Sequence, residues 1–256
     1  MCDLIQKSWR VLATGFACAS FLLGGAALAA LVFPVLAIRP EGRQARTQQL
    51  IHLAFRFYLG MLRGLGLIRL EVFGGERLAA CCGKIIAANH PTLLDVVFLM
   101  ALTPRARCIV KHDLWENWYL KGVVRAAGYI RNDLPPDETI AACREALGRG
   151  ENLIVFPEGT RSRISEPMRL HRGVAHIAML TGTSIQPVVI SCDPPTLTKG
   201  DPWYRVPPRR PYFRLEIAPL IDMERFMAYP HQGLGARRLI TELREFYTRR
   251  LVHGSA

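Results

Sequence analysis

The feature that most constrains this chain is a run of 28 residues without a charged side chain, residues 11–38. As a helix rising about 1.5 Å per residue, the run would be about 42 Å long, whereas the hydrocarbon core of a bilayer is about 30 Å thick. Its glycines and Pro34 make a kinked or re-entrant hairpin an alternative to a straight span. A cleaved signal peptide is the rival interpretation, with Lys7 and Arg10 before the run and small residues at Ala27 and Ala29 that resemble a small-x-small cleavage site. Because the apolar run continues beyond that site, we favour an uncleaved membrane anchor.

The distribution of charge points to an anionic partner. The chain has 33 Lys and Arg against 21 Asp and Glu, a net charge of +12. Residues 1–80 carry 9 basic and 4 acidic groups and residues 161–256 carry 15 and 8, whereas residues 81–160 carry 9 of each. Basic flanks are attracted to phospholipid headgroups or to nucleic acid. Because the positive charge accompanies apolar helices, we expect a membrane phospholipid surface and no nucleic-acid partner.

Two further counts concern the compartment. The seven cysteines are odd in number and include no CxxC pair, which argues against a disulfide framework or a zinc ribbon and favours a reducing compartment. Three arginines follow the apolar run and two basic residues precede it, which favours a body on the cytoplasmic side of an inner membrane.

Residues 50–70 predict an amphipathic helix. His52, Arg56 and Arg63 fall in one narrow sector, and the remaining face is broad and apolar. Such a helix is expected at the interface of an anionic leaflet, although an ordinary domain helix with a solvated basic edge has the same pattern. We therefore predict a membrane anchor and interfacial helix over residues 1–73 and a separate domain over residues 74–256.

The pattern of the second region is that of alternating strands and helices, which predicts an α/β fold with a mixed, largely parallel sheet flanked by helices. Residues 193–211 contain six prolines and predict an irregular excursion between two strands. The predicted strands are 84–88, 107–110, 152–156, 185–190 and 213–217, and the predicted helices are 92–101, 114–127, 137–147, 173–180 and 235–251.

The first stretch with the residues for chemistry is NHPTLLD, residues 89–95, directly after a predicted strand. Pro91 suits the first position of a helix, which would leave His90 at the turn between strand and helix. Asp95 lies about one turn further on and can fold back toward the imidazole. A histidine paired with a carboxylate is a general base that can remove a proton from a hydroxyl. A helix-capping histidine beside a surface aspartate remains the alternative.

The second stretch is FPEGTRS, residues 156–162, which also follows a predicted strand. Ligands of parallel α/β sheets bind beyond the carboxyl ends of the strands. Gly159 lets a ligand approach the backbone, and Arg161 offers a planar fork for phosphate, so we predict an anion pocket. The alternative is a structural turn in which Glu158 pairs with Arg161. Further cationic residues follow at Arg163, Arg169, His171 and Arg172.

Together the two stretches resemble the glycerolipid acyltransferases, specifically the lysophosphatidic acid (1-acylglycerol-3-phosphate) acyltransferases. That family has an Asn-His pair followed, after four residues, by an Asp, and Asn89, His90 and Asp95 match it. Its FPEGTRS block is matched residue for residue, and Pro187 between apolar residues resembles a later block. The resemblance covers roughly residues 85–190 and implies a glycerolipid acyltransferase-like catalytic domain within residues 74–256.

The resemblance implies an enzyme that acylates the free hydroxyl of a lysophospholipid. His90, oriented by Asp95, would deprotonate the hydroxyl, whose oxygen would attack the thioester of acyl-CoA or acyl-carrier protein. Neither motif contains a cysteine and the chain has no GxSxG elbow, so we expect direct transfer without an acyl-enzyme. We expect no metal and no cofactor beyond the acyl donor. The residues implied to bind the substrate are Glu158, Gly159, Thr160, Arg161, Arg131 and Lys111.

The block between the two motifs departs from the family pattern. Trp118 stands about where a proline is usual, Lys121 is near the place of a glycine, and Arg131 comes early. Because this block is associated with the acceptor, the identity of the acceptor stays open. Phosphatidic acid synthesis is the leading interpretation. The alternatives are the same chemistry on a different or phosphate-free lipid, and a catalytically idle membrane-binding scaffold.

Overall fold

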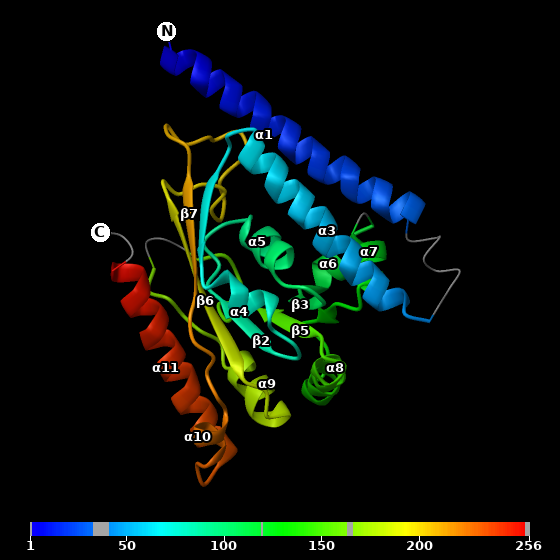
Figure 1. Ribbon diagram of the computed structural model, residues 1–256. Coiled ribbons are helices and arrows are strands. Elements are labelled where there is room, and N and C mark those ends of the chain that lie inside the picture. Colours follow the sequence, from blue (N-terminus) through cyan, green and yellow to red (C-terminus); the bar gives the residue numbers. More distant parts are fainter. Residues whose placement is uncertain (1, 33–40, 119, 163–165, 254–256) are drawn as a thin grey trace.

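The computed structural model describes residues 2–32, 41–118, 120–162 and 166–253, so the end of the apolar run and Arg163 lie outside the described residues. Seven strands form a sheet in the order β1-β7-β6-β2-β5-β3-β4 (Figure 1). The strands are β1 (Arg69–Phe73), β2 (Ile85–Ala88), β3 (Ala106–Val110), β4 (Ile130–Arg131), β5 (Asn152–Val155), β6 (Ile185–Asp193) and β7 (Tyr212–Ile217). The helices are α1 (Cys2–Ala27), η1 (Leu28–Val32), α3 (Arg43–Gly64), α4 (Gly75–Ala79), α5 (Asp95–Leu102), α6 (His112–Glu116), α7 (Lys121–Ala126), α8 (Pro136–Gly148), α9 (Gly173–Thr181), α10 (Glu224–Met227) and α11 (Gln232–His253).

The sheet is mixed and largely parallel, as predicted. Strands β2 to β6 run in one direction, β7 is antiparallel to β6, and β1 is parallel to β7. Ile85 of β2 is level with Leu153 of β5 and with Ile185 of β6. Because these three neighbours are parallel and in register, the segments that follow β2 and β5 leave the sheet at the same edge.

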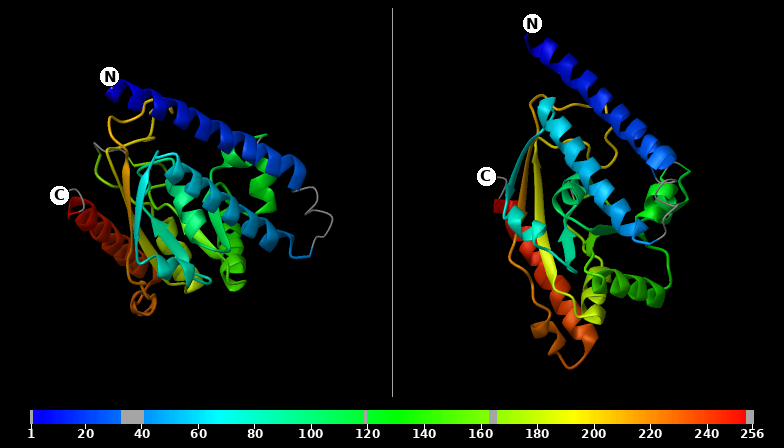
Figure 2. Two further views of the ribbon diagram at one scale, coloured as in Figure 1. Left: turned by 45° about the horizontal axis from the view of Figure 1, so that its top comes forward. Right: turned by 45° about the vertical axis from the view of Figure 1, so that its right-hand side comes forward.

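Helices cover both faces of the sheet, and the alternation of side chains along β2 serves both layers (Figure 2). Ile86 and Ala88 belong to the core that includes residues of α1, α3 and α5. Ile85 and Ala87 belong to the core beneath α8, α9 and α11. A fully buried aliphatic side chain contributes about 1.5–3 kcal/mol, so a strand buried on both faces is firmly held. The two motifs therefore extend from strands whose residues are all buried.

Several elements differ from the sequence predictions. The helix predicted at 50–70 is α3, which begins earlier and ends at Gly64, and the chain then turns through Gly66 at φ +73° into β1. A glycine with positive φ ends a helix more effectively than the apolar periodicity of Leu65–Leu70 can extend it. The sheet thus begins at β1, before the boundary predicted between residues 73 and 74. The helix predicted at 114–127 is divided into α6 and α7, and the two-residue strand β4 was not predicted.

The first helix packs against the body by its small residues. Ala13 and Ala17 are buried, and Tyr58 of α3 donates a hydrogen bond from its hydroxyl to the Ala17 carbonyl over 3.2 Å. On the other side of the helix, Leu12 and Phe16 are exposed. Within the described residues, the stretch Gln6–Ala30 is the one helical segment whose length and hydropathy would allow it to cross a membrane.

Candidate active site

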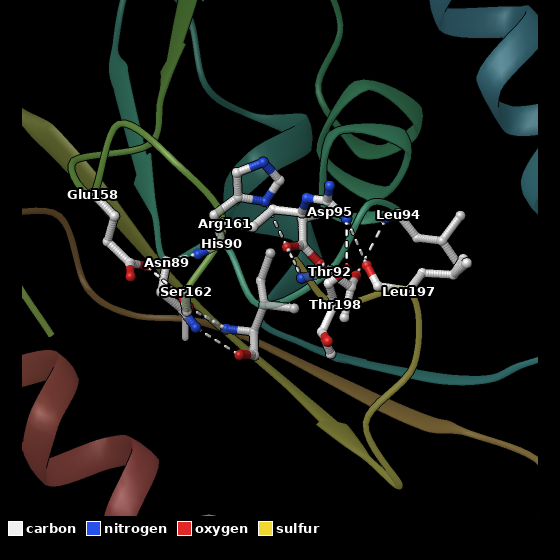
Figure 3. Close-up of polar contacts among 11 residues, drawn as sticks. Asn89, His90, Thr92, Leu94, Asp95, Glu158, Arg161, Ser162, Leu197 and Thr198 are labelled. Carbon is white, nitrogen blue, oxygen red and sulfur yellow. Dashed lines mark hydrogen bonds and ion pairs between the residues drawn. The ribbon is translucent and has the colours of Figure 1, made fainter. Parts of the chain in front are cut away.

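The site is built around His90, which lies just beyond the carboxyl end of β2. Its Nδ1 is 2.8 Å from Oδ2 of Asp95, the first residue of α5 (Figure 3). An ionised carboxylate can only accept a hydrogen bond, so Nδ1 carries the proton and Nε2 is left as a proton acceptor. The His90 side chain is 16% exposed and that of Asp95 is fully buried. The geometry is that of a general base oriented by a carboxylate.

The carboxylate of Asp95 is held by Thr92. Its Oδ2 accepts a bond from the Thr92 amide over 2.7 Å, and its Oδ1 accepts one from the Thr92 hydroxyl over 2.6 Å. Burial raises the pKa of Asp95 above its ordinary value, and the hydrogen bonds from His90 and Thr92 oppose that rise. These bonds also change the local fold. The helix begins at Asp95 and not at Pro91, because side chain to backbone bonds of Thr92 and Asp95 replace a first helical turn.

The imidazole is also fixed from the side of β5. The ring of Phe156 stacks on that of His90, with centroids 4.1 Å apart and planes inclined by 22°. Below it, the Asn89 side chain donates to the Ile190 carbonyl over 2.8 Å and accepts from the Ile190 amide over 2.7 Å. His90 therefore lies against Phe156, which follows β5, and its neighbour Asn89 is bonded to β6. These contacts limit the motion of the ring.

Glu158 connects the two motifs. Its Oε1 accepts a hydrogen bond from the His90 amide over 2.9 Å and one from the Ser162 hydroxyl over 2.8 Å, and the Ser162 amide donates to the His90 carbonyl over 2.7 Å. These contacts differ from the predicted alternative, a structural turn in which Glu158 pairs with Arg161. The resemblance implies that Glu158 binds substrate; in the structure Glu158 is buried and its carboxylate joins the two loops.

Arg161 lies against a segment that the sequence did not associate with the site. Its Nη1 donates to the carbonyls of Leu197 and Thr198 over 3.0 and 2.8 Å (Figure 3). Both bonds use Nη1, so the Nε and Nη2 protons are not used by them. Backbone carbonyls have no signature in a sequence, and no motif could have indicated these two partners.

Gly159 and Thr160 complete the turn between Glu158 and Arg161. Gly159 has φ +65°, and a Cβ at this position would lie 3.1 Å from Cδ2 of His171. A side chain is therefore disfavoured both by the backbone conformation and by the close ring. Thr160 is half-buried in the same turn. Gly159 itself is exposed to solvent.

Lys111 and Arg131 lie at the same edge of the sheet but away from this cluster. Lys111 follows β3 and is exposed, and Arg131 ends β4, where it pairs with Asp133 over 2.6 Å. Strands are about 4.8 Å apart, so the backbones of β3 and β4 are about 10 and 14 Å from β2. The structure therefore brings together His90, Asp95, Glu158, Gly159, Thr160 and Arg161, and leaves Lys111 and Arg131 outside.

An apolar cavity of about 60 Å³ adjoins the site. It lies between α1, α3 and the segment after β6, and its lining includes Leu94 of the first motif and Leu197, whose carbonyl contacts Arg161. Within the part of the chain that the structure describes, no three His, Cys, Asp or Glu side chains are grouped so as to hold a metal ion. The arrangement offers a base, a guanidinium and an apolar wall.

Comparisons with known proteins find acyltransferases. The family model described as Acyltransferase matches residues 69–191. A 1-acyl-sn-glycerol-3-phosphate acyltransferase of Helicobacter pylori is 34% identical over 129 residues, covering 48% of this chain and 53% of the relative. The human 1-acyl-sn-glycerol-3-phosphate acyltransferase alpha is 29% identical over 175 residues, covering 64% of this chain and 58% of the relative. The chain thus spans little more than half the length of these curated relatives.

The fold comparison extends over nearly the whole chain. The crystal structure of the 1-acyl-sn-glycerophosphate (LPA) acyltransferase PlsC from Thermotoga maritima superposes with a TM-score of 0.70 at 19% identity, covering 99% of this chain and 98% of the other. At this identity the likeness concerns the fold, and the matched motifs concern the family. Residues 69–191, which carry both motifs, match the acyltransferase family.

Proposed function

We propose that this protein is an O-acyltransferase that transfers a fatty acyl group from acyl-CoA or acyl-carrier protein to the free hydroxyl of 1-acylglycerol-3-phosphate, giving phosphatidic acid. The observation that carries the proposal is the union of the His90–Asp95 pair and the Arg161 loop through the Glu158 carboxylate. The relatives named above support the choice of acceptor.

The residues suggest the following steps. His90 Nε2 takes the proton of the acceptor hydroxyl as its oxygen attacks the thioester carbonyl, and the buried Asp95 carboxylate stabilises the imidazolium. The tetrahedral intermediate then breaks its C–S bond, and the imidazolium returns the proton to the leaving thiolate. General-base assistance of this kind supplies a factor of about 10²–10⁴. Arg161 binds the acceptor phosphate through Nε and Nη2, because its Nη1 is engaged by two carbonyls.

The acceptor assignment is tested with Arg161→Ala and a panel of acceptors. Purified enzyme in detergent is given labelled acyl-CoA or acyl-carrier protein with either 1-acylglycerol-3-phosphate or the phosphate-free 1-acylglycerol. Charge-assisted hydrogen bonds contribute about 1.5–3 kcal/mol, so kcat/KM for the phosphate acceptor should fall about 10- to 100-fold. The phosphate-free acceptor should be used as well as by the unaltered protein.

Arg161→Lys is the matched variant, since it keeps the charge and loses the planar fork. It should recover part of the lost kcat/KM for the phosphate acceptor. Equal losses with both acceptors would contradict the assignment of Arg161 as the phosphate ligand. A selective loss with the phosphate acceptor in Arg131→Ala, and not in Arg161→Ala, would assign that role to Arg131 of β4. An absence of acyl transfer with every acceptor and donor would favour the idle scaffold.

We further propose that α1 lies in the membrane interface and does not span the bilayer, with the body on the cytoplasmic side. Hydrogen bonds join the helix to the body at Ala17, whose carbonyl accepts from Tyr58, and at Arg10, which donates to the Pro207 carbonyl over 2.9 Å. A spanning helix would have to leave these contacts. Its outer face exposes Leu12, Phe16 and Leu23, which suits insertion beneath the headgroups.

Phe16→Asp is expected to weaken binding to anionic phospholipid vesicles about tenfold or more, because burial of a phenylalanine is worth about 1.5–3 kcal/mol. Co-sedimentation with vesicles measures the effect. Leu220→Asp, at an exposed leucine far along the chain from α1, is the matched control and should bind as the unaltered protein does. Retention of full-length protein in membranes after alkaline carbonate extraction, in both variants alike, would indicate a spanning helix.

A further inference from the structure

The segment between β6 and β7 forms a third wall of the site. Leu197 in this segment has a backbone carbonyl that accepts two hydrogen bonds, from the Leu93 amide over 3.1 Å and from Nη1 of Arg161 over 3.0 Å. Leu93 lies between His90 and Asp95 in the first motif. One carbonyl of the segment therefore joins the loop that holds the base to the guanidinium of the second motif. Figure 3 shows the bond from Arg161 to this carbonyl.

The direction of that carbonyl depends on an unusual backbone conformation. Leu197 has φ +51°, in the left-handed region that residues other than glycine and asparagine rarely adopt. A conformation of this kind persists only where the surroundings impose it. Part of the surroundings is a turn that follows at once, from Thr198 to Asp201.

Asp201 closes this turn. Its Oδ2 accepts hydrogen bonds from the Thr198 hydroxyl and from the Thr198 amide, the latter over 3.2 Å, and its own amide donates to the Thr198 carbonyl over 3.2 Å. The same Thr198 carbonyl accepts the 2.8 Å bond from Arg161. The bond from the Thr198 hydroxyl lowers the pKa of Asp201, which keeps the carboxylate ionised as an acceptor. The carboxylate also has a charged partner, Arg205, whose Nη1 is 3.3 Å from Oδ1.

We propose that Asp201 is a positioning residue for Arg161. By holding Thr198 it fixes the two carbonyls that engage Nη1, and so sets the plane in which Nε and Nη2 are offered to the acceptor phosphate. The inference rests on the proposed function of Arg161 as the phosphate ligand. Asp201 itself acts through Thr198 and not on the substrate.

Asp201→Ala, which removes the acceptor of both Thr198 bonds, is expected to raise the KM for 1-acylglycerol-3-phosphate about tenfold and to change kcat less than about twofold, because the phosphate is remote from the reacting hydroxyl and is bound equally in ground and transition states. Use of the phosphate-free 1-acylglycerol should be unaltered. In an Arg161→Ala background the same substitution should add nothing, since it acts only through Arg161. Thr198→Val, which loses one donor, should raise the same KM by a smaller factor, about threefold.

Arg209→Ala is the control within the same segment. It removes an exposed ion pair with Asp193, whose side chains are 71% and 70% exposed, and the KM should not change. Equal losses with both acceptors, or effects of Asp201→Ala and Arg161→Ala that add, would make Asp201 a structural residue and overturn the inference. Selective loss in Arg161→Ala without selective loss in Asp201→Ala would overturn this inference alone. If Arg161→Ala loses activity equally with the phosphate and the phosphate-free acceptor, the proposed role of Arg161 as the phosphate ligand is itself wrong.

Discussion

Replacement of His90 by alanine is expected to lower kcat by a factor of about 10²–10⁴, with the KM for the acceptor changed less than about threefold. The imidazole is the one group of the cluster with a free acceptor nitrogen, because Nδ1 is engaged by Asp95 over 2.8 Å. Alanine removes the proton acceptor but leaves the Arg161 loop and its links through Glu158, which use the His90 backbone. Transfer of labelled acyl groups by purified protein in detergent gives both kinetic constants.

His176→Ala is the matched control, since His176 is an exposed histidine of α9. It should retain the kcat of the unaltered protein. A His90→Ala variant that transfers acyl groups within about threefold of the normal rate would refute the assignment of His90 as the base. A loss confined to KM would make the imidazole a binding group.

The sequence was sufficient to predict the fold class because its strongest signals are local. All five predicted strands are present at their predicted places, and the alternation of strands with helix-length connections correctly indicated a largely parallel sheet. The strands that were missed lack such a signal. β4 has only two residues, and β1 has apolar residues that also continue the pattern of the preceding helix.

The site could be predicted only where it is made of side chains in motifs. His90 and Asp95 are in contact because the chain between them forms a tight turn around Thr92. The carbonyls of Leu197 and Thr198 come from an irregular segment 36 and 37 residues after Arg161, and no composition or spacing encodes where a backbone carbonyl points. Glu158 was identified as important, but its role as a link between loops depends on tertiary packing.

The carboxylate behind the base gives the second large effect. Asp95→Asn is expected to lower kcat about 10²- to 10³-fold, because the amide cannot stabilise the imidazolium as a carboxylate does. The Thr92 amide donates to the oxygen that also faces His90, so the asparagine oxygen should take that place and keep the proton on Nδ1. A flipped amide would impose the wrong tautomer and a larger loss, of about 10⁴-fold.

The same variant should alter the pH dependence of stability. Burial raises the pKa of Asp95 above its ordinary value of 3.8, so the folded protein holds this proton to a higher pH than the unfolded chain does. Between those two pKa values the folded state binds more protons, and the free energy of unfolding falls as the pH rises. Asp95→Asn removes this titration, so its stability relative to the unaltered protein should increase as the pH is raised above 3.8. Denaturant unfolding between about pH 4 and 7 measures the difference, with Asp113→Asn, at an exposed aspartate, as the control. If the difference runs the other way, the bonds from His90 and Thr92 outweigh burial, and Asp95 is a carboxylate that the fold stabilises in its charged form.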